Sequence, residues 1–389
     1  MTGKRRWGIV VRFFRIFIPF SVISSCVQED GKNNTPPVSI REIKNQYARN
    51  FRILKMGSEK VFISYIDKNK KDSVVYILYQ NEKPKPSLSG EVHFIKIPVA
   101  TAASLSLNFI EILSELGELG ALVGIDHGYY SSNRVVREGV RQNKIAELCD
   151  LDALNLERTI KLKPAVLLIN PSGDKRKDFD NRLMHAGVMP VVCADYLEMD
   201  PLGRAEWIRV FGLLFGREAQ ADSIFTAIKE KYLFIKKKFE KVKNKPTVFS
   251  GLKMGDSWFV PGGESYVAKL FSDAGSFYVW KEKKISGSIS LSLEEVLNSA
   301  GHAQFWVNLH ACKSRSELEK LDKRYTLFEA FKSHRLYNNN LHQNPEGGNP
   351  YFETGPLHPE WILEDLSAIF HPDSFPSSYL FHYYLNLAP

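Results

Sequence analysis

Four short segments of this 389-residue chain combine aromatic rings with polar groups, and three of them lie in loops after a predicted strand. The segments are Asp126–Tyr130, Asp256–Gly263, Asn308–His310 and Asn349–Glu353. Within them the candidate ligand-binding residues are His127, Tyr129, Tyr130, Trp258, Asn308, His310 and Tyr351. Aromatic faces with a few polar tips suit a planar or aryl-decorated metal chelate, so these segments predict a binding site for such a molecule.

Ordinary packing offers a second explanation for each of these side chains. It accounts for Tyr129, Tyr130 and Trp258 as well as ligand binding does. His310 could equally be a histidine that is buried in the core with its hydrogen bonds satisfied. Both interpretations of these residues therefore stay open.

The sequence contains none of the short motifs that indicate catalysis or phosphate binding. It lacks a nucleophile elbow, a glycine-rich phosphate loop and a His-x-x-x-His pair. His127 and His310 stand apart, whereas a bare metal receptor needs a tight cluster of ligands. Cys149, Cys193 and Cys312 lack metal-ligand spacing and lie in or beside apolar segments, so we expect buried free thiols. We therefore expect no enzyme, no resident cofactor and no metal site.

A short pattern occurs once in each half of the chain: a capping residue, leucine, glutamate, a short helix, a break and a strand. Its glutamates are Glu157, after the cap Asn155, and Glu294, after the cap Ser292. In the second copy Glu295 completes a capping box with Ser292, so Glu294 is not needed to cap the helix. Each glutamate could simply favour the helix dipole, by ~0.3–1 kcal/mol. Matching positions in both halves favour another role, in which the two carboxylates contact a two-fold symmetric partner.

The elements around these residues alternate between strands and helices. Residues 61–66 and 74–79 are rich in β-forming side chains and predict a hairpin, which a third strand over 92–98 follows. Further strands are expected over 122–125, 166–169, 188–193, 247–252, 277–280 and 305–309, and helices over 106–116, 177–186, 266–273 and 293–298. This alternation predicts an α/β fold with mostly parallel sheets.

Residues 202–242 interrupt the alternation with two helices. The first is expected over Leu202–Phe215, and the second runs from Arg217 to Val242 without glycine or proline. The second helix keeps apolar residues at steps of three and four and ends before Pro246. At ~1.5 Å per residue it is about 40 Å long, which is enough to join two lobes.

Several segments resemble the helical-backbone class of ABC-importer substrate-binding proteins, which serves siderophores, haem and cobalamin. They are Asn155–Pro164, Pro201–Trp207 and Gly355–Leu366 with His371-Pro372, and the resemblance spans roughly residues 47–376. It implies two lobes, each with a central, mostly parallel sheet flanked by helices. One long helix joins the lobes, and the ligand lies between them. It also implies that Glu157 and Glu294 dock on arginines of the permease dimer.

On this resemblance we expect an N-lobe at 47–216, an interlobe helix at 217–245 and a C-lobe at 246–389, with the N-terminal β-hairpin as an addition. The expected function is capture of an iron-siderophore or related metal chelate by a monomer, which delivers it to the permease. The metal then arrives as part of the cargo. Haem or cobalamin binding stays an alternative, as do a metal-dependent envelope enzyme of the same fold and a lipoprotein that stores its ligand without a permease.

The N-terminus resembles a bacterial lipoprotein signal. Residues 1–25 contain five basic residues, no acidic one and an apolar stretch at 16–23, and Cys26 follows them. The resemblance implies cleavage before Cys26 and acylation of its sulfur, whereas a plain secretory signal is the alternative. The polar residues after Cys26 predict a tether over 26–46. We expect a lipid-anchored protein of the bacterial cell envelope that faces the periplasm, and the acidic pair at 29–30 leaves cell-surface exposure open.

The formal net charge of +8 depends largely on this leader. Without residues 1–25, the excess of lysine and arginine over aspartate and glutamate falls to +3. The densest basic run, Lys236–Lys245, alternates with apolar residues on the predicted long helix, as a solvated helix face does. We therefore expect no nucleic-acid partner.

Overall fold

The computed structural model describes residues 40–67, 69–82, 91–150 and 153–387. The expected signal segment at 1–25, Cys26 and most of the expected tether lie outside these residues. Within the described ranges, no helix is both long and apolar enough to cross a membrane. Cys149, Cys193 and Cys312 are free thiols, as predicted; Cys193 and Cys312 are buried and Cys149 is half-buried.

The first described residues form a five-stranded sheet that contains the expected hairpin. Its strands are β1 Ile40–Ile43, β2 Phe51–Met56, β3 Glu59–Tyr65, β4 Ser73–Tyr79 and β5 Val92–Lys96, in that order across the sheet. Neighbours are antiparallel except β4 and β5, which are parallel. Strand β1 falls within the expected tether, so regular structure begins before residue 47. In the first half of β2, Phe51 and Ile53 are buried in the core and Arg52 between them is exposed, as the two-residue period of a strand requires.

Two buried carboxylates fasten the segment between β1 and β2 to the N-lobe. Glu206 accepts hydrogen bonds from the backbone N–H groups of residues 46–48 at 2.7–2.8 Å. Glu198 accepts bonds from the N–H groups of residues 49 and 50 at 2.8–3.0 Å and from the indole of Trp207 at 3.2 Å. We call Glu198 and Glu206 the carboxylate clamp. Two side chains satisfy five successive backbone donors here, because a carboxylate can accept several bonds at once.

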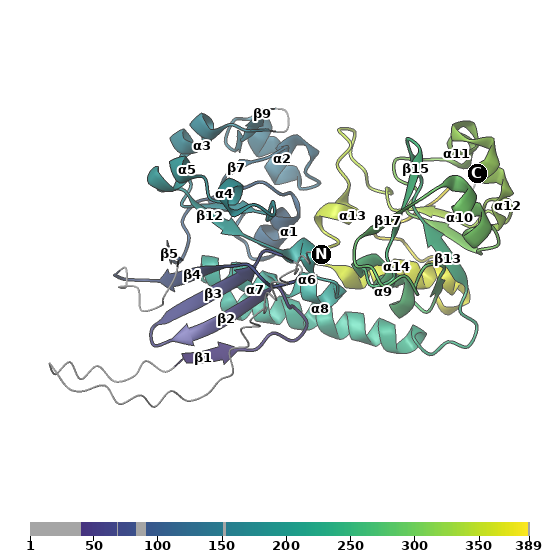
Figure 1. The fold of residues 1–389 in the computed structure, drawn as a ribbon, viewed down its shortest axis with the longest axis horizontal. Helices are drawn as coiled ribbons and strands as arrows, with labels where there is room; N and C mark the ends of the chain where they lie inside the picture. The colour runs from purple at the N-terminus through teal and green to yellow at the C-terminus, as the bar shows by residue number, and fades with distance from the viewer. Residues whose placement is uncertain (1–39, 68, 83–90, 151–152, 388–389) are drawn as a thin grey trace, which may run out of the picture. The chain divides into compact units, whose positions relative to one another are not determined.

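The N-lobe contains a parallel sheet, as predicted. Its strands, in order across the sheet, are β12 Met189–Val192, β11 Val166–Ile169, β6 Ala102–Ser104, β7 Leu122–Ile125 and β8 Ala146–Glu147. All of their pairings are parallel. Strand β11 is buried at every position, which is typical of a central parallel strand covered on both faces. Other elements of this lobe include α1 Asn108–Glu115, α2 Arg134–Arg141, α3 Leu156–Leu162, β9 Cys149–Asp150 and β10 Ala153–Leu154 (Figure 1).

Two predicted helices of the N-lobe are each broken into two. The stretch 177–186 forms α4 Lys175–Asp178 and α5 Asn181–His185, because Asp180 accepts a hydrogen bond from the backbone of Arg182 and caps a new helix. The stretch 202–215 forms α6 Pro201–Ala205 and α7 Ile208–Phe215. This second break falls at Glu206 and Trp207, where one residue belongs to the clamp and the other bonds to it.

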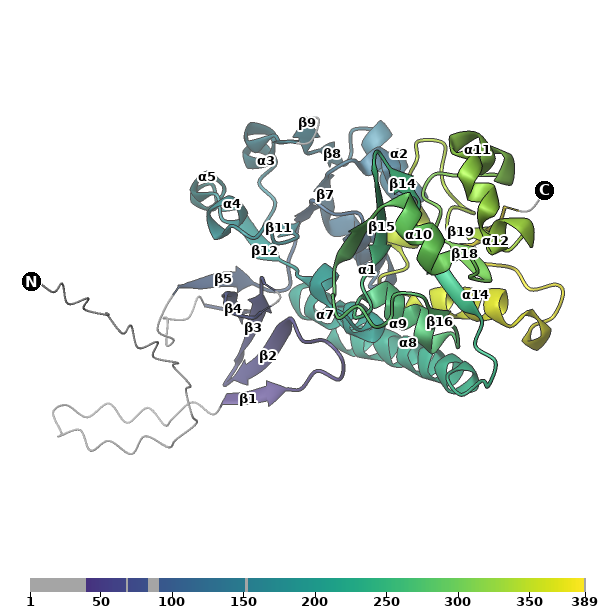
Figure 2. The ribbon, with the colours of Figure 1, turned by 45° about the vertical axis from the view of Figure 1, so that its right-hand side comes forward.

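The predicted interlobe helix is α8, Glu218–Phe239, which runs along elements of both lobes (Figures 1 and 2). It follows Gly216, whose φ of 71° ends α7 in the left-handed conformation that glycine adopts readily. The apolar face of α8 packs against α7 and against α14, Pro359–Phe370, in the C-lobe. Tyr232 of α8 also donates a hydrogen bond to Asp273 of the C-lobe at 2.7 Å. The prediction of one helix joining two lobes is confirmed.

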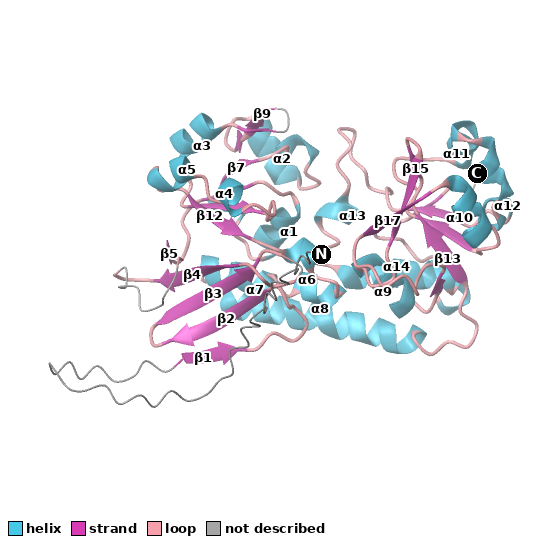
Figure 3. Cartoon of the chain, in the orientation of Figure 1, coloured by secondary structure: helices cyan, strands magenta, loops and turns pink. Residues whose placement is uncertain are grey.

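The C-lobe has its own mostly parallel sheet (Figure 3). Its strands, in order, are β16 Phe277–Tyr278, β13 Thr247–Ser250, β18 Phe305–Val307, β19 Leu336–Asn338 and β20 Leu385–Asn386. Within this sheet β20 pairs antiparallel and the other pairings are parallel. The helices include α9 Tyr266–Asp273 and α10 Leu293–Ala300, which match the predictions, and α11 Arg315–Leu321, α12 Glu329–Lys332 and α13 Pro350–Glu353.

The C-lobe also contains a small antiparallel sheet that the sequence does not predict. It comprises β14 Lys253–Met254, β15 Ser257–Pro261 and β17 Ser288–Leu291. The interpretation of Asp256–Gly263 as a loop is therefore wrong. Burial alternates along β15, but the strand is short and glycines, which usually indicate turns, flank it on both sides.

The last described residues fold back onto the C-lobe. Asp365 of α14 accepts hydrogen bonds from the Tyr379 hydroxyl at 2.7 Å and from the backbone N–H groups of His382 and Tyr383 at 3.0 and 2.8 Å. Strand β20 then pairs with β19 at the edge of the sheet. These residues lie beyond the segments that resemble a known family, and they extend the sheet of the C-lobe.

Candidate functional site

A pocket of about 720 Å³ lies between the lobes and is lined by residues of both. The N-lobe contributes Asn108, Asp126, His127, Asn170 and Arg204, and the C-lobe contributes His310, Gln343, Phe352 and Glu353, among others. Strands β6, β7, β11 and β18 lead at their carboxyl ends into this lining. Ligands of open α/β sheets bind at that edge, so the pocket occupies the position that the fold predicts for a ligand.

His127 lines the pocket directly after β7, in a strained backbone conformation with φ of 52°. The buried side of the loop is held by Glu147, which accepts hydrogen bonds from the N–H groups of His127 and Gly128 at 2.5 and 3.0 Å. Burial raises the pKa of Glu147, although these two amides oppose the shift. The Nδ1 atom of His127 lies 2.5 Å from a carboxylate oxygen of Asp126. This contact occupies one ring nitrogen and leaves Nε2 for another partner.

Tyr129 and Tyr130 lie beside His127 but do not line the pocket. Their rings are 4.5 Å apart, and the ring of Tyr130 stacks on His127 at 5.8 Å. Tyr129 is 40% exposed. The carbonyl oxygen of Tyr130 accepts a hydrogen bond from the Asn344 amide of the C-lobe at 2.9 Å. The structure therefore brings three of the predicted residues together, with the two tyrosines supporting the histidine.

The C-lobe side of the pocket depends on a strained loop after β18. Asn308 and His310 both have positive φ, at 59° and 51°. The buried amide of Asn338 shapes this loop, because it accepts a bond from the N–H of Leu309 and donates one to the carbonyl of His310, both at 2.8 Å. His310 lines the pocket, and burial lowers the pKa of its ring, so the neutral imidazole is favoured. Asn308 instead accepts a hydrogen bond from the hydroxyl of Tyr384 at 2.9 Å.

Arg204 is a pocket residue that the sequence analysis does not single out. Its guanidinium pairs with Asp195 at 3.0 Å and lies over the ring of Tyr266, a C-lobe residue, at 5.1 Å. Asn108 donates to the same carboxylate oxygen of Asp195 at 2.8 Å. The buried Nε of Arg204 has no hydrogen-bond partner, which makes it a donor that a ligand could use. Its position in Pro201–Trp207, a segment of the family resemblance, is the signal that could have indicated it.

Contacts across the lobe boundary surround the pocket. Glu353 of α13 accepts hydrogen bonds from the hydroxyl of Ser131 and from the backbone N–H of Ser132 in the N-lobe. Burial raises the pKa of Glu353, and these donors oppose the shift. Arg141 of α2 pairs with Glu346 of the C-lobe at 3.0 Å. The carboxylate of Glu353 is thus engaged by the protein, and it sets the position of α13.

Trp258 and Tyr351 lie inside the C-lobe rather than at the pocket. Trp258 is 0% exposed, packs among Phe249, Trp306 and Phe328, and donates its indole hydrogen to the carbonyl of Ser250 at 3.1 Å. The prediction that Trp258 lies in a loop is wrong, since β15 places it in the core. Tyr351 is also buried and meets Tyr384 edge-on, with ring centroids 5.9 Å apart. For these two residues packing is the interpretation that fits their surroundings.

Glu157 and Glu294 are exposed on the first turns of α3 and α10, one on each lobe. The predicted capping box of α10 is present, with Ser292 and Glu295 exchanging bonds at 2.7 and 3.1 Å. The bond from the backbone of Ser292 lowers the pKa of Glu295. Glu294, 67% exposed in its side chain, pairs with Arg324 at 2.9 Å. Neither glutamate lines the interlobe pocket.

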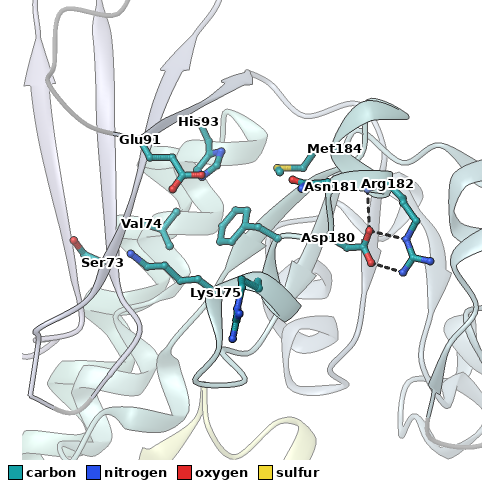
Figure 4. Close-up of a pocket in the computed structure, with 11 residues that line it drawn as sticks. Ser73, Val74, Glu91, His93, Lys175, Asp180, Asn181, Arg182 and Met184 are labelled. Atoms are coloured by element: carbon teal, nitrogen blue, oxygen red, sulfur yellow. Dashed lines mark hydrogen bonds and ion pairs between the residues drawn. The ribbon is translucent and has the colours of Figure 1, made fainter.

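Two further hollows lie away from the strand ends at which the fold predicts a ligand. One of about 540 Å³ lies within the N-lobe between β4, β5 and helices α4 and α5 (Figure 4). Its Arg182 is already paired with Asp180 at 2.7 Å, and its His93 stacks on Phe179 at 4.5 Å. The other, of about 1010 Å³, is also lined by both lobes, with residues 46–50 and 197–200 on the N-lobe side and 263–286 on the C-lobe side, among others, and it contains the clamp residue Glu198. Neither hollow includes the loops that follow β7 and β18.

Comparisons with known proteins agree on one fold. Residues 103–339 match the profile of a family described as periplasmic binding protein. Two uncharacterized lipoproteins of Methanocaldococcus jannaschii are 25% and 23% identical to this chain, over 91% and 80% of each sequence. A periplasmic binding protein of Veillonella parvula aligns with a TM-score of 0.61 at 14% identity, over 81% of this chain and 99% of that one. A periplasmic haem-binding protein of Vibrio cholerae aligns with a TM-score of 0.55 at 14% identity, over 70% and 99%.

Proposed function

Since the chain belongs to the periplasmic binding protein family, we propose that it is the substrate-binding protein of an ABC importer. It captures an iron-siderophore or a related metal chelate between its lobes and delivers it to the permease. The metal enters as part of the cargo, and the protein, acting as a monomer, binds this cargo without converting it.

One observation supports this proposal above the others: His127 and His310 line the same pocket from opposite lobes. Asp126 lies against Nδ1 of His127, and partial desolvation lowers the pKa of His310, so each imidazole offers a nitrogen that can bind a metal or accept a hydrogen bond. The side-chain oxygen of Asn170 adds an acceptor that has no hydrogen-bond partner, and the Nε of Arg204 adds a donor that has none. Such a lining suits a chelate whose metal retains replaceable ligands.

Haem and cobalamin are the alternative cargoes. Structures with this fold include the haem-binding protein of Vibrio cholerae and a vitamin B12-binding protein of the same organism, which aligns with a TM-score of 0.52 at 13% identity. If the protein is instead a metal-dependent envelope enzyme, it converts the bound molecule into a product. Native mass spectrometry of protein purified from its own host distinguishes these cases, because the mass of the bound molecule identifies siderophore, haem or cobalamin directly. Turnover of that molecule by the purified protein would support the enzyme.

We expect His127→Ala and His310→Ala each to weaken binding of the identified cargo by about 10- to 100-fold, which corresponds to ~1.4–2.8 kcal/mol. Each substitution removes a polar contact to the bound molecule from one lobe. Fluorescence or calorimetric titration measures the affinity. The matched controls are His185→Ala and His302→Ala, which remove exposed histidines, one from each lobe, outside the pocket. Unchanged affinity in both pocket variants would move the binding site elsewhere.

The same function requires the protein to remain at the membrane, and we infer that Cys26 provides a lipid anchor. The lipoprotein relatives of Methanocaldococcus jannaschii support this inference. We expect Cys26→Ser to abolish labelling by a radioactive fatty acid and to release the protein from the membrane fraction, because the sulfur that accepts the acyl group is gone. Cell fractionation of wild-type and variant protein provides the measurement. A wild-type protein without covalent lipid would contradict the anchor.

A further inference from the structure

A buried histidine at the start of α14 faces carboxylates from the other lobe. His358 is 5% exposed, and its Nε2 lies 3.7 Å from a carboxylate oxygen of Glu111 and 3.8 Å from one of Glu115, both on α1. These distances are too long for hydrogen bonds, and Nε2 has no hydrogen-bond partner. The other ring nitrogen, Nδ1, lies 2.9 Å from Glu360. The ring thus directs one unused nitrogen toward two carboxylates.

Local structure fixes each member of this cluster. Glu111 and Glu115 stand four residues apart on α1, so their side chains share one face of the helix. His358 is the N-cap residue of α14, and its ring stacks on Trp361 with centroids 3.8 Å apart and planes 7° from parallel. The indole and Glu360 together hold the imidazole in one orientation. The orientation of the ring is therefore set by contacts within the C-lobe.

The cluster concentrates negative charge. Glu111, Glu115 and Glu360 all meet at His358, and among the described residues none of the three forms an ion pair with lysine or arginine. Even with a proton on His358, three carboxylates leave a net negative charge in a partly dry site. A divalent cation would neutralise it.

We propose that Glu111, Glu115 and His358 bind a divalent first-row transition-metal ion, such as zinc, between α1 and α14. Their ligand atoms lie within 4.8 Å of one another. Atoms bound tetrahedrally to zinc at ~2.0–2.1 Å are about 3.4 Å apart, so a contraction of a few tenths of an ångström between Nε2 and each carboxylate creates the site. Mixed nitrogen and carboxylate ligands suit such ions.

Glu360 has the position of a residue that tunes a metal ligand rather than binding the metal itself. Histidines that ligate metals usually donate their second ring N–H to a carboxylate, which fixes the tautomer and makes the free nitrogen more basic. The contact between Nδ1 of His358 and Glu360 has this arrangement.

The metal would connect the two lobes at a place distinct from the cargo. Glu111 and Glu115 belong to the N-lobe and His358 to the C-lobe, and none of the three lines the interlobe pocket. Like the contacts of α8, this bridge would restrict movement of one lobe against the other. The site goes beyond the proposed transport function, since it is a resident metal and not part of the cargo.

The test is calorimetric titration of the chelator-treated full chain with Zn²⁺, with Co²⁺ as a spectroscopic probe. Wild-type protein is expected to bind one equivalent of Zn²⁺, and the Co²⁺ form to show the visible absorption of nitrogen and oxygen ligation. His358→Gln and the double variant Glu111→Gln/Glu115→Gln are expected to weaken Zn²⁺ binding more than 100-fold. Glu360→Gln is expected to weaken it about 10- to 100-fold, the usual effect of losing a carboxylate behind a metal ligand.

Two matched controls separate this site from others. His382→Gln removes another histidine, which stacks on Trp361 and contacts the carboxylate of Asp365. This variant should still bind Zn²⁺ as the wild type does. His127→Gln/His310→Gln should also retain it, whether or not cargo binding is lost. Absence of stoichiometric binding by the wild type, its persistence in His358→Gln, or its loss in the pocket variant would each overturn the proposal. Glu115→Gln alone, at a partly exposed position, provides the same test if His358→Gln does not fold.

Discussion

Replacing Glu157 and Glu294 together with alanine is expected to abolish cargo uptake by whole cells while cargo affinity stays at the wild-type value. Both side chains are exposed, one per lobe, and neither touches the pocket. A permease dimer would present one arginine to each. Truncating one partner of an interfacial ion pair costs ~2–5 kcal/mol when the pair is buried, so loss of two such pairs removes docking at physiological concentrations. Uptake of labelled cargo and titration of the purified protein provide the two measurements.

The structure adds a difference between the two glutamates that sharpens this experiment. Glu294 is paired with Arg324, whereas Glu157 makes no ion pair within the part of the chain that the structure describes. In the expected docking, Glu294 would have to exchange Arg324 for an arginine of the permease. Arg324→Ala should consequently leave uptake intact or increase it, although it alters the same ion pair. Charge reversal at Glu157 and Glu294 should be worse than truncation, because it places like charges face to face.

Glu295→Ala provides the matched control for docking. It removes one half of the capping box of α10, which should lower stability slightly and leave uptake largely unchanged. Normal uptake in the double variant Glu157→Ala/Glu294→Ala would exclude the docking role and leave both residues as acids that favour a helix start.

Glu206→Ala is expected to lower the free energy of unfolding by ~3–5 kcal/mol, the usual range for removing one partner of a buried charged network. Glu206 is fully buried and accepts bonds from three backbone N–H groups and from Arg209 at 3.1 Å. Without the carboxylate, these donors lose their partner in a place where water has little access. Urea unfolding followed by circular dichroism measures the change. Glu206→Gln should lower the free energy of unfolding by less than Glu206→Ala does, because the amide keeps one oxygen that can accept a hydrogen bond.

Glu230→Ala is the control for this stability measurement. It removes an exposed glutamate from α8, and a surface change of this kind is usually worth less than ~0.5 kcal/mol. If Glu206→Ala unfolded at the same urea concentration as Glu230→Ala, the carboxylate clamp would not hold the N-terminal segment in solution.

The parts of the fold that sequence predicts well are those set by local periodicity. The long helix follows from apolar residues at helical spacing, which are the residues that α8 buries. Strands such as β11 are continuous apolar runs between turn signals, and the capping box of α10 is a four-residue pattern. In these cases the interactions that decide the structure lie within a few residues of each other.

The sequence-based predictions fail where contacts between residues far apart in the sequence determine the structure. Trp258 lies in the core because β15 pairs with β17, some thirty residues later in the chain. His127 and His310 could be singled out because each follows a strand, whereas Arg204 lies in a segment of the family resemblance but becomes a pocket residue only through the packing of its helix. The residues of the proposed metal site are likewise adjacent only after α14 packs near α1, so no spacing rule could have joined them.

The carboxylate clamp also determines how mechanical load would travel through the molecule. Tension on the chain before residue 40 would first peel the short, exposed strand β1, and the five bonded amides at residues 46–50 would then resist it together. Glu206, which belongs to the clamp, would carry part of this force. It lies two residues after Arg204, which lines the pocket. The end of α6 is therefore the point at which a pull on the N-terminal segment and the grip on a bound molecule would meet.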